Sequence, residues 1–397
     1  MLVYTSVTKS YVPKARVLAR SLKHFHPDWT FVLLFSDSFP KDFDIGTEPF
    51  DEILTIDQLG LSDWKKWAFA HTVVELCTAV KGPAAELLAK RNGIDKIMYL
   101  DPDVQVFNSL AGLESQLDQH DVLLTPHLLD AERDVDAIRT NEINALKFGV
   151  YNLGFFAAKT SGQGLEFIQW WAERLRLFCR DDIPSGLFTD QRWCDLAPAL
   201  FSRLAIVRDR GCNVATWNIG HRVLSKDGAG IFFAGGVPLR FYHFTGYDSG
   251  AGISTLRHYA PEQKVAHELW ERYERALVSE GHGSARYEGW KYGCFENGEP
   301  IDRELRRLYA VRPDLQRAFP DPFSTSEPCL LNWWKVEGKQ LGSSVGEANI
   351  APRRTVLARI LHGIIVPRVG YQLIKSVLRV LRIEGVSGLV RRLGNYS

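Results

Sequence analysis

The sequence is poor in the features that mark several specialised classes of protein. It has 6 Cys in 397 residues, and no two of them form a C-x-x-C pair. This spacing fits neither a zinc ribbon nor a disulfide-rich scaffold, so we expect free thiols in a reducing compartment. No run of about 18 or more apolar residues occurs, which argues against a membrane-spanning helix. The opening residues MLVYTSVT lack the charged start of a signal peptide. We therefore expect a cytoplasmic protein.

An excess of one charge is also absent, because 48 Lys and Arg face 47 Asp and Glu. Nothing in this balance favours a nucleic-acid partner. The charge is uneven, however: residues 353–397 carry nine Lys or Arg and one acid, Glu384. Apolar residues recur there at helical spacing on both sides of Pro367, which predicts two basic amphipathic helices. Such helices would hold the protein peripherally on an anionic membrane, at the inner face of the plasma membrane. The alternative is a terminal helix packed on the body with a solvated basic face.

Strand-like and helix-like segments alternate in the first third of the chain. The apolar runs predict strands at 2–7, 31–35, 53–56, 97–100 and 122–125, and helices at 14–25 and 67–88, the second interrupted at Gly82-Pro83. This order is typical of an α/β protein with a Rossmann-like, mostly parallel sheet. Ligands of such sheets bind at the carboxyl ends of the strands.

The rest of the chain adds shorter elements and predicts three domains. We expect strands at 154–158, 204–207 and 239–244, and helices at 165–178, 263–278 and 302–308. Gly, Pro and aromatic residues gather between 281 and 339, and 343–352 resembles a linker. The predicted domains are 1–260, a helical and irregular extension at 261–342, and the basic amphipathic tail at 353–397.

The strongest candidate for chemistry is Asp101-Pro102-Asp103. Two carboxylates one residue apart can bind a hard divalent cation such as Mn²⁺ or Mg²⁺. The same D-x-D form occurs at 42–44 and 134–136, so the pattern alone is weak. Only Asp101 directly follows a strongly apolar strand, at 97–100, which predicts its place at the ligand-binding edge of the sheet. The alternative is a turn that ends the strand.

Three later segments carry polar groups beside predicted strands or helices. His243, at the end of an apolar strand, is a candidate third metal ligand, or else a histidine of the core. Asp190 and Gln191 stand at a predicted helix start, where they act on a substrate or simply cap the helix. Asn152 enters a strand, or else belongs to a plain turn.

These segments occur in a familiar order along the chain: YLDPDV, NLGFF, TDQ, the pair Trp217-Asn218, and HFTG. As an ordered set they resemble the nucleotide-sugar glycosyltransferases of the GT-A fold, and most nearly glycosyltransferase family 8. Residues 75–81 and 290–293 are similar to segments of transferases from bacterial surface-polysaccharide clusters. The resemblance spans roughly residues 1–335. It implies a GT-A domain followed by the extension and the tail.

The resemblance also implies a metal site and a phosphate site. Asp101 and Asp103 match the metal-binding D-x-D, with Asp101 also touching the donor ribose, and His243 matches the histidine that completes the site. Gly246 matches a glycine that approaches the diphosphate. The Lys-Pro-Trp that usually follows this glycine is absent, so Lys81 becomes the substitute candidate for binding phosphate.

Further positions correspond to contacts with the donor. Asn152 matches an asparagine that touches the donor sugar, and Asp190 and Gln191 match a pair beside the anomeric carbon. The residues expected to grip the uridine are Thr5, Ser6 and Tyr11.

The implied activity is metal-dependent transfer of a sugar from a UDP-sugar to a glycan or lipid-linked glycan, in surface-polysaccharide synthesis. Retention is favoured, through a covalent carboxylate or front-side attack, while inversion stays open. The aromatic residues of 287–334 would stack on the acceptor, or else cover the sheet. One rival is a sugar-1-phosphate nucleotidylyltransferase, although residues 5–20 lack its glycine-rich loop. The other is a non-catalytic membrane-associated binding protein, although the metal ligands are all present.

Overall fold

The computed structural model describes residues 1–40 and 43–338. The predicted linker at 343–352 and the predicted amphipathic tail at 353–397 lie outside the described residues. Among the residues that are described, no helix combines the length and the apolar character needed to cross a bilayer. All six cysteines fall in the described part, and all are free thiols.

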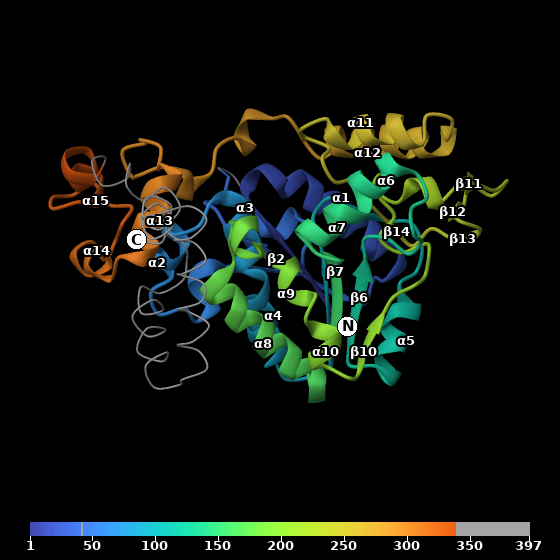
Figure 1. The fold of residues 1–397 in the computed structure, drawn as a ribbon, viewed down its shortest axis with the longest axis horizontal. Coiled ribbons are helices and arrows are strands. Elements are labelled where there is room, and N and C mark those ends of the chain that lie inside the picture. The colour runs from blue at the N-terminus through green and yellow to red at the C-terminus, as the bar shows by residue number, and fades with distance from the viewer. Residues whose placement is uncertain (41–42, 339–397) are drawn as a thin grey trace, which may run out of the picture. The chain divides into compact units, whose positions relative to one another are not determined.

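A seven-stranded sheet forms the centre of the protein (Figure 1), in the order β10-β6-β7-β4-β1-β2-β3. Its strands are β1 (Leu2–Val7), β2 (Thr30–Phe35), β3 (Glu52–Thr55), β4 (Lys96–Leu100), β6 (Val122–Pro126), β7 (Tyr151–Lys159) and β10 (Leu204–Ile206). Every neighbouring pair is parallel except those of β7, which runs antiparallel to β4 and β6. The predicted α/β class and mostly parallel sheet are confirmed. Because β7 is reversed, its beginning lies where β4 ends.

Helices cover both faces of this sheet. On one face, α4 (Lys81–Ala89) and α8 (Gly162–Phe178) pack in a cluster with Tyr4, Tyr99 and Phe156. On the other, α1 (Val12–Phe25) and α5 (Ala111–Gln119) pack against Met98 and Phe155. The strand residues alternate between these two clusters, as the two-residue period of a strand requires. A three-layer α/β/α arrangement results.

The predicted helix at 67–88 is instead three helices, α2 (Trp64–Phe69), α3 (Val73–Ala79) and α4. The expected break at Gly82-Pro83 is wrong. Thr72 starts α3 with a capping box, in which the Glu75 carboxylate accepts from the Thr72 backbone N–H at 2.9 Å. Pro83 lies in the first turn of α4, where a missing N–H costs little. A Cβ on Gly82 would lie 2.6 Å from the Cα of Ala172, so glycine lets α4 lie close against α8.

A second, two-stranded sheet was only half predicted. The expected strand at 239–244 is β14 (Phe241–His243), and it pairs antiparallel with β5 (Val104–Val106), which the sequence did not indicate. In this register His243 faces Val104, directly after Asp103. Asp103 and His243 are therefore neighbours, although 140 positions separate them in the sequence.

A third cluster of buried apolar residues lies beside this small sheet. It is formed by α11 (Ala251–Tyr259), α12 (Lys264–Ser279), β11 (Leu224–Lys226), β12 (Phe232–Ala234) and neighbouring loops, with β13 (Val237–Pro238) completing a three-stranded sheet. The remaining short elements are α6 (Val135–Ala137), α7 (Ile143–Phe148), β8 (Asp181–Asp182), β9 (Leu187–Phe188), α9 (Gln191–Cys194) and α10 (Ala197–Leu200).

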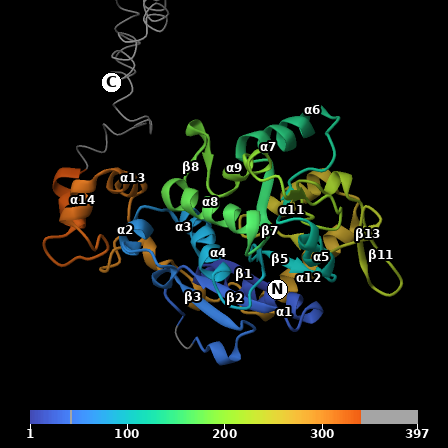
Figure 2. The same cartoon turned by 90° about the horizontal axis from the view of Figure 1, so that it is seen from below.

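The aromatic segment after α12 packs against the body. The Trp290 indole N–H donates to the Ser36 carbonyl at 3.0 Å, and Tyr292 joins the first hydrophobic cluster. Beyond it, α13 (Arg303–Val311) and α14 (Pro313–Ala318) lie beside α2 in both views (Figures 1 and 2), followed by α15 (Leu330–Trp333). Arg306 of α13 donates to the Phe69 carbonyl at 2.9 Å. These contacts favour the interpretation of the segment as cover for the sheet.

Candidate active site

A cavity of about 670 Å³ opens at the carboxyl ends of β1 and β4. Nine of the eleven predicted site residues line it: Ser6, Tyr11, Lys81, Asp101, Asp103, Asn152, Asp190, Gln191 and His243. Thr5 is buried inside β1, and Gly246 follows the lining residue Thr245 with a positive φ of 68°. The carboxyl ends of parallel strands meet at one edge of a sheet, and this explains the position of the cavity.

Asp101, Asp103 and His243 form a candidate metal site. One ligand atom from each lies within 4.8 Å of the other two. The Nε2 of His243 is 3.0 Å from Oδ1 of Asp103 and 3.7 Å from Oδ2 of Asp101. The other oxygen of Asp101 accepts hydrogen bonds from the Tyr99 hydroxyl at 2.7 Å and from Lys81 at 3.1 Å. Asp101 is thereby held with Oδ2 turned to the site. Two carboxylates and one imidazole suit Mg²⁺ or Mn²⁺.

The electrostatics of these three residues also fit a cation. Burial alone would raise the pKa of Asp103, but His243 and Lys14 hold this pKa down to about 2. Burial alone would lower the pKa of His243, but Asp103 and Asp101 outweigh it and raise this pKa. A proton on Nε2 is therefore favoured at the point between the carboxylates where a metal ion would sit.

The imidazole of His243 is oriented by Asn213, which the sequence analysis missed. The amide Nδ2 of Asn213 donates to Asn152 Oδ1 at 3.0 Å and to the Thr125 hydroxyl at 2.9 Å. This leaves Oδ1 of Asn213 toward Nδ1 of His243, at 3.3 Å. Because that oxygen can only accept, Nδ1 carries a proton, and the lone pair of Nε2 becomes available once its own proton leaves. Asn213 adopts φ 51°, a conformation that asparagine tolerates better than most residues.

Lys81 and Asp190 form an ion pair behind the metal site. The Lys81 ammonium lies 2.8 Å from Asp190 Oδ2, and it also reaches Asp101. Burial would lower the pKa of Lys81, but Asp101 and Asp190 together raise it. Burial raises the pKa of Asp190, and Lys81 offsets part of that rise. The ammonium proposed as a phosphate ligand is thus engaged by two carboxylates of the site.

The backbone before Asp190 is strained. Thr189 adopts φ 43°, which is unfavourable for a β-branched residue. Its N–H donates to the Arg180 carbonyl at 2.8 Å, and its hydroxyl donates to Asp190 Oδ1 at 3.1 Å. The Trp171 indole donates to the Asp190 carbonyl at 3.1 Å. These contacts fix the carboxylate against the cavity wall rather than leaving it as a simple helix cap.

The charges and the unpaired hydroxyls of the cavity both call for a ligand. Asp101, Asp103 and Asp190 supply three negative charges, against two positive charges from Lys81 and the protonated His243, in a site largely removed from water. Such an excess is costly unless a cation compensates for it. At the ends of β1 and β2, the hydroxyls of Thr5, Ser6 and Ser36 are buried with no hydrogen-bond partner among the described residues. Of these three residues, Ser6 lines the cavity, where a polar group of a bound ligand would satisfy its hydroxyl.

Asp134 and Asp44, from the other two D-x-D segments, make local contacts. The Asp134 carboxylate accepts from the backbone N–H groups of Asp136 and Ala137 at 3.0 Å each, and so caps α6. Asp44 accepts from the Gly46 N–H at 2.9 Å. Both are turn or cap contacts of the usual kind.

Two further residues near the site, Lys14 and His127, carried no recognisable signal, whereas Trp217 belongs to the Trp217-Asn218 pair noted in the sequence. Lys14 is buried in α1 and lies 2.5 Å from Asp248, and its charge acts on Asp103. Trp217 packs edge-on against His243 and His127, with both ring centroids 5.4 Å away. Lys14 looked like an ordinary helix residue, and only its tertiary neighbours set it apart.

No profile of a known protein family matches the chain. Two proteins of Bacillus subtilis (strain 168), each described only as uncharacterized, are similar to it. YfnF is 28% identical over 177 residues, which cover 44% of this chain and 57% of YfnF. YfnD is 24% identical over 250 residues, which cover 61% of this chain and 76% of YfnD. The chain thus spans little more than half the length of the first of these relatives.

Solved structures similar to the chain include several glycosyltransferases. The galactosyltransferase LgtC, in complex with donor and acceptor sugar analogs, matches with 15% identity over 70% of this chain and 96% of its own, at a TM-score of 0.40. Mouse xyloside xylosyltransferase 1 matches with 13% identity over 62% and 97%, at a TM-score of 0.35. At this distance neither decides the activity of the chain.

Proposed function

We propose that this chain is a metal-dependent glycosyltransferase that moves a sugar from a UDP-sugar to a glycan or lipid-linked glycan, in the synthesis of surface polysaccharide. One observation carries the proposal. The three candidate metal ligands meet at one point of a cavity, and Asp190 is joined to them through Lys81. In this proposal the basic segment 353–397, outside the described residues, holds the enzyme at an anionic membrane surface.

The residues have separable tasks in this reaction. Asp101, Asp103 and His243 would hold Mn²⁺ or Mg²⁺, which supplies positive charge to the departing diphosphate. Lys81 favours the ionised form of Asp190 against the effect of its burial, because the ammonium lies 2.8 Å from the carboxylate. Asp190 stabilises the positive charge that develops at the anomeric carbon. Ser6, which lines the cavity, offers its hydroxyl to the nucleotide, and Asn152 and Gln191 contact the transferred sugar.

We further propose that transfer retains the anomeric configuration. The Asp190 carboxylate is 4% exposed and held by Lys81 and Thr189, which suits a fixed stabiliser better than a base that must reach an acceptor. The anomeric proton coupling of the first product formed, measured by ¹H NMR, tests this. A product of inverted configuration would contradict retention and leave metal-dependent transfer standing.

The nucleotide and metal dependence can be tested directly by thermal unfolding. We expect UDP with Mn²⁺ to raise the melting temperature more than GDP, ADP or CMP with Mn²⁺, and more than UDP alone. A ligand present at about 100 times its Kd adds roughly 2.7 kcal/mol to the free energy of unfolding. Equal melting temperatures across the panel at millimolar nucleotide would overturn the proposal.

Asn213 is expected to act on the metal through His243. Replacing Asn213 with glycine keeps the backbone at φ 51° free of strain and removes the hydrogen bond to Nδ1 of His243. We expect about a 10–100-fold loss of Mn²⁺ affinity, measured by calorimetry. The ¹⁵N spectrum of His243 gives a second readout, because its Nδ1–H form should lose population. An unchanged tautomer with full affinity would remove Asn213 from this role.

A further inference from the structure

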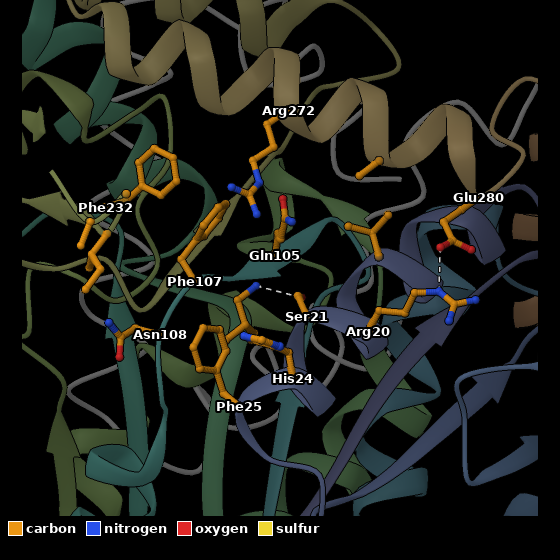
Figure 3. A pocket seen from close by; sticks show the side chains of 16 residues that line it. Arg20, Ser21, His24, Phe25, Gln105, Phe107, Asn108, Phe232, Arg272 and Glu280 are labelled. Carbon is orange, nitrogen blue, oxygen red and sulfur yellow. Dashed lines mark hydrogen bonds and ion pairs between the residues drawn. The ribbon is translucent and has the colours of Figure 1, made fainter. Parts of the chain in front are cut away.

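A second cavity, of about 630 Å³, lies in the angle between α1 and α12, and it shares no lining residue with the catalytic cavity. Figure 3 shows it from close by. Its walls come from α1, from β5 and the residues after it, from the loop before β12, and from α12. The volume is within the range of about 300–1,000 Å³ that is usual for small-molecule sites.

Gln105 contributes an unsatisfied acceptor to this cavity. It lies in the middle of β5, where it faces Tyr242 of β14 across the pair of strands. The residue is 8% exposed, and its Oε1 has no hydrogen-bond partner among the described residues. A buried carbonyl oxygen without a donor costs about 1–3 kcal/mol, so this position calls for a donor such as a hydroxyl group.

Arg272 contributes a cation that no acid neutralises. It reaches from α12 toward Gln105 and Phe107 (Figure 3). In the described part of the chain no carboxylate lies within 4.0 Å of its guanidinium, which lies 5.9 Å from the centroid of the Phe232 ring. The other arginine of the cavity, Arg20, is paired with Glu280 at 2.7 Å. The cavity therefore has one positive charge left over.

Aromatic rings supply the remaining surface. Phe107 and Phe232 meet edge-to-face, with centroids 5.5 Å apart, and Phe25 closes the wall near α1. The negative face of such a ring attracts the positive edges of C–H bonds. A flat apolar face beside a lone acceptor and a guanidinium suits a ring that has C–H bonds on one side, hydroxyl groups at its rim and one anionic substituent.

We propose that this cavity is a second saccharide-binding site, and that its ligand is a hexuronic acid unit of a glycan. The carboxylate of the sugar pairs with Arg272, a ring hydroxyl donates to Gln105 Oε1, and the C–H face lies on Phe107. A single carboxylate matches the one unpaired cation. The site goes beyond the proposed transfer reaction, because it holds a glycan away from the cavity that contains Asp103.

Saturation-transfer NMR on the full chain tests the site, with methyl β-glucuronide as the probe and methyl β-glucoside as its neutral counterpart. Both are titrated first without nucleotide and then with UDP and Mg²⁺ present in excess. We expect the glucuronide to bind at least about tenfold more tightly than the glucoside, because the guanidinium adds a charge-assisted hydrogen bond. We also expect the excess UDP to leave the glucuronide signal unchanged. Displacement by UDP would place the sugar in the catalytic cavity and overturn the assignment.

Matched variants locate the binding. Arg272→Met keeps an apolar stem on exposed helix surface and should weaken glucuronide binding about tenfold, to the level of the glucoside. Arg275→Met, on the same helix at a residue that lines no part of this cavity, should change nothing. Gln105→Met should weaken both probes. Equal binding to wild type and Arg272→Met would overturn the proposal. Since no readout uses transfer, a failure here and a failure of the proposed reaction are distinguishable.

Discussion

Replacing Asp103 with alanine is expected to abolish metal-dependent activity. The substitution removes the oxygen that lies 3.0 Å from Nε2 of His243, so that only two of the three protein ligands remain. Loss of a residue that merely orients a ligand costs about 10–100-fold in affinity or activity, and loss of the ligand itself should cost more. We expect more than a 100-fold loss of Mn²⁺ affinity by calorimetry, with sugar transfer from a UDP-sugar falling at least as far.

Asp134→Ala is the matched control for this variant. Asp134 belongs to the same kind of D-x-D segment, but it caps α6 through the N–H groups of Asp136 and Ala137. Its loss should lower the free energy of unfolding by about 0.5–2 kcal/mol and leave Mn²⁺ affinity unchanged. Full Mn²⁺ affinity in Asp103→Ala would show that Asp103 is not a ligand.

Gly154→Ala is expected to disrupt the same site without removing any ligand. A Cβ at this position of β7 would lie 2.7 Å from Nδ1 of His243 and 2.7 Å from Oδ1 of Asn152. The imidazole cannot easily retreat, because Trp217 packs against it. Overpacking of this kind costs about 1–3 kcal/mol of stability. We expect the displaced imidazole to lower Mn²⁺ affinity by more than about tenfold, since ligand orientation is disturbed.

Gly112→Ala provides the comparison. Gly112 lies in α5, and a Cβ there would meet nothing within 4 Å. This alanine should stabilise the protein by about 0.4–1 kcal/mol, because it reduces the freedom of the unfolded chain. Mn²⁺ affinity should stay at the wild-type value. If calorimetry gave the same affinity for Gly154→Ala, the close approach of β7 to His243 would have no bearing on the metal.

The sequence predicted the regular part of the fold well. Continuous apolar runs such as 31–35 and 97–100 are buried on both faces in a parallel sheet, and the structure places both in the central sheet as β2 and β4. The predicted break at Gly82-Pro83 failed because a local signal was outweighed by packing against α8. The strand β5 was missed because three residues carry too little periodicity to be recognised.

The candidate site was predicted in part. Asp101 was singled out because it follows an apolar strand, and position in a parallel sheet is a property that a sequence can express. Asn213 was not singled out, because its importance rests on hydrogen bonds to three residues that lie on β6, β7 and β14. Gln105 looked like any polar residue of a short segment, and only its burial makes its oxygen an open acceptor.

The sequence by itself determined the α/β class, the mostly parallel sheet and the edge at which Asp101 and Asp103 lie, because these depend on local hydrophobic patterns. Only the tertiary structure decided which distant groups meet there. The pairing of β14 with β5 brings His243 beside Asp103, and the approach of α4 to the sheet buries Lys81 between two carboxylates. Register and helix packing arise from contacts between segments far apart in the chain, and no local pattern encodes them.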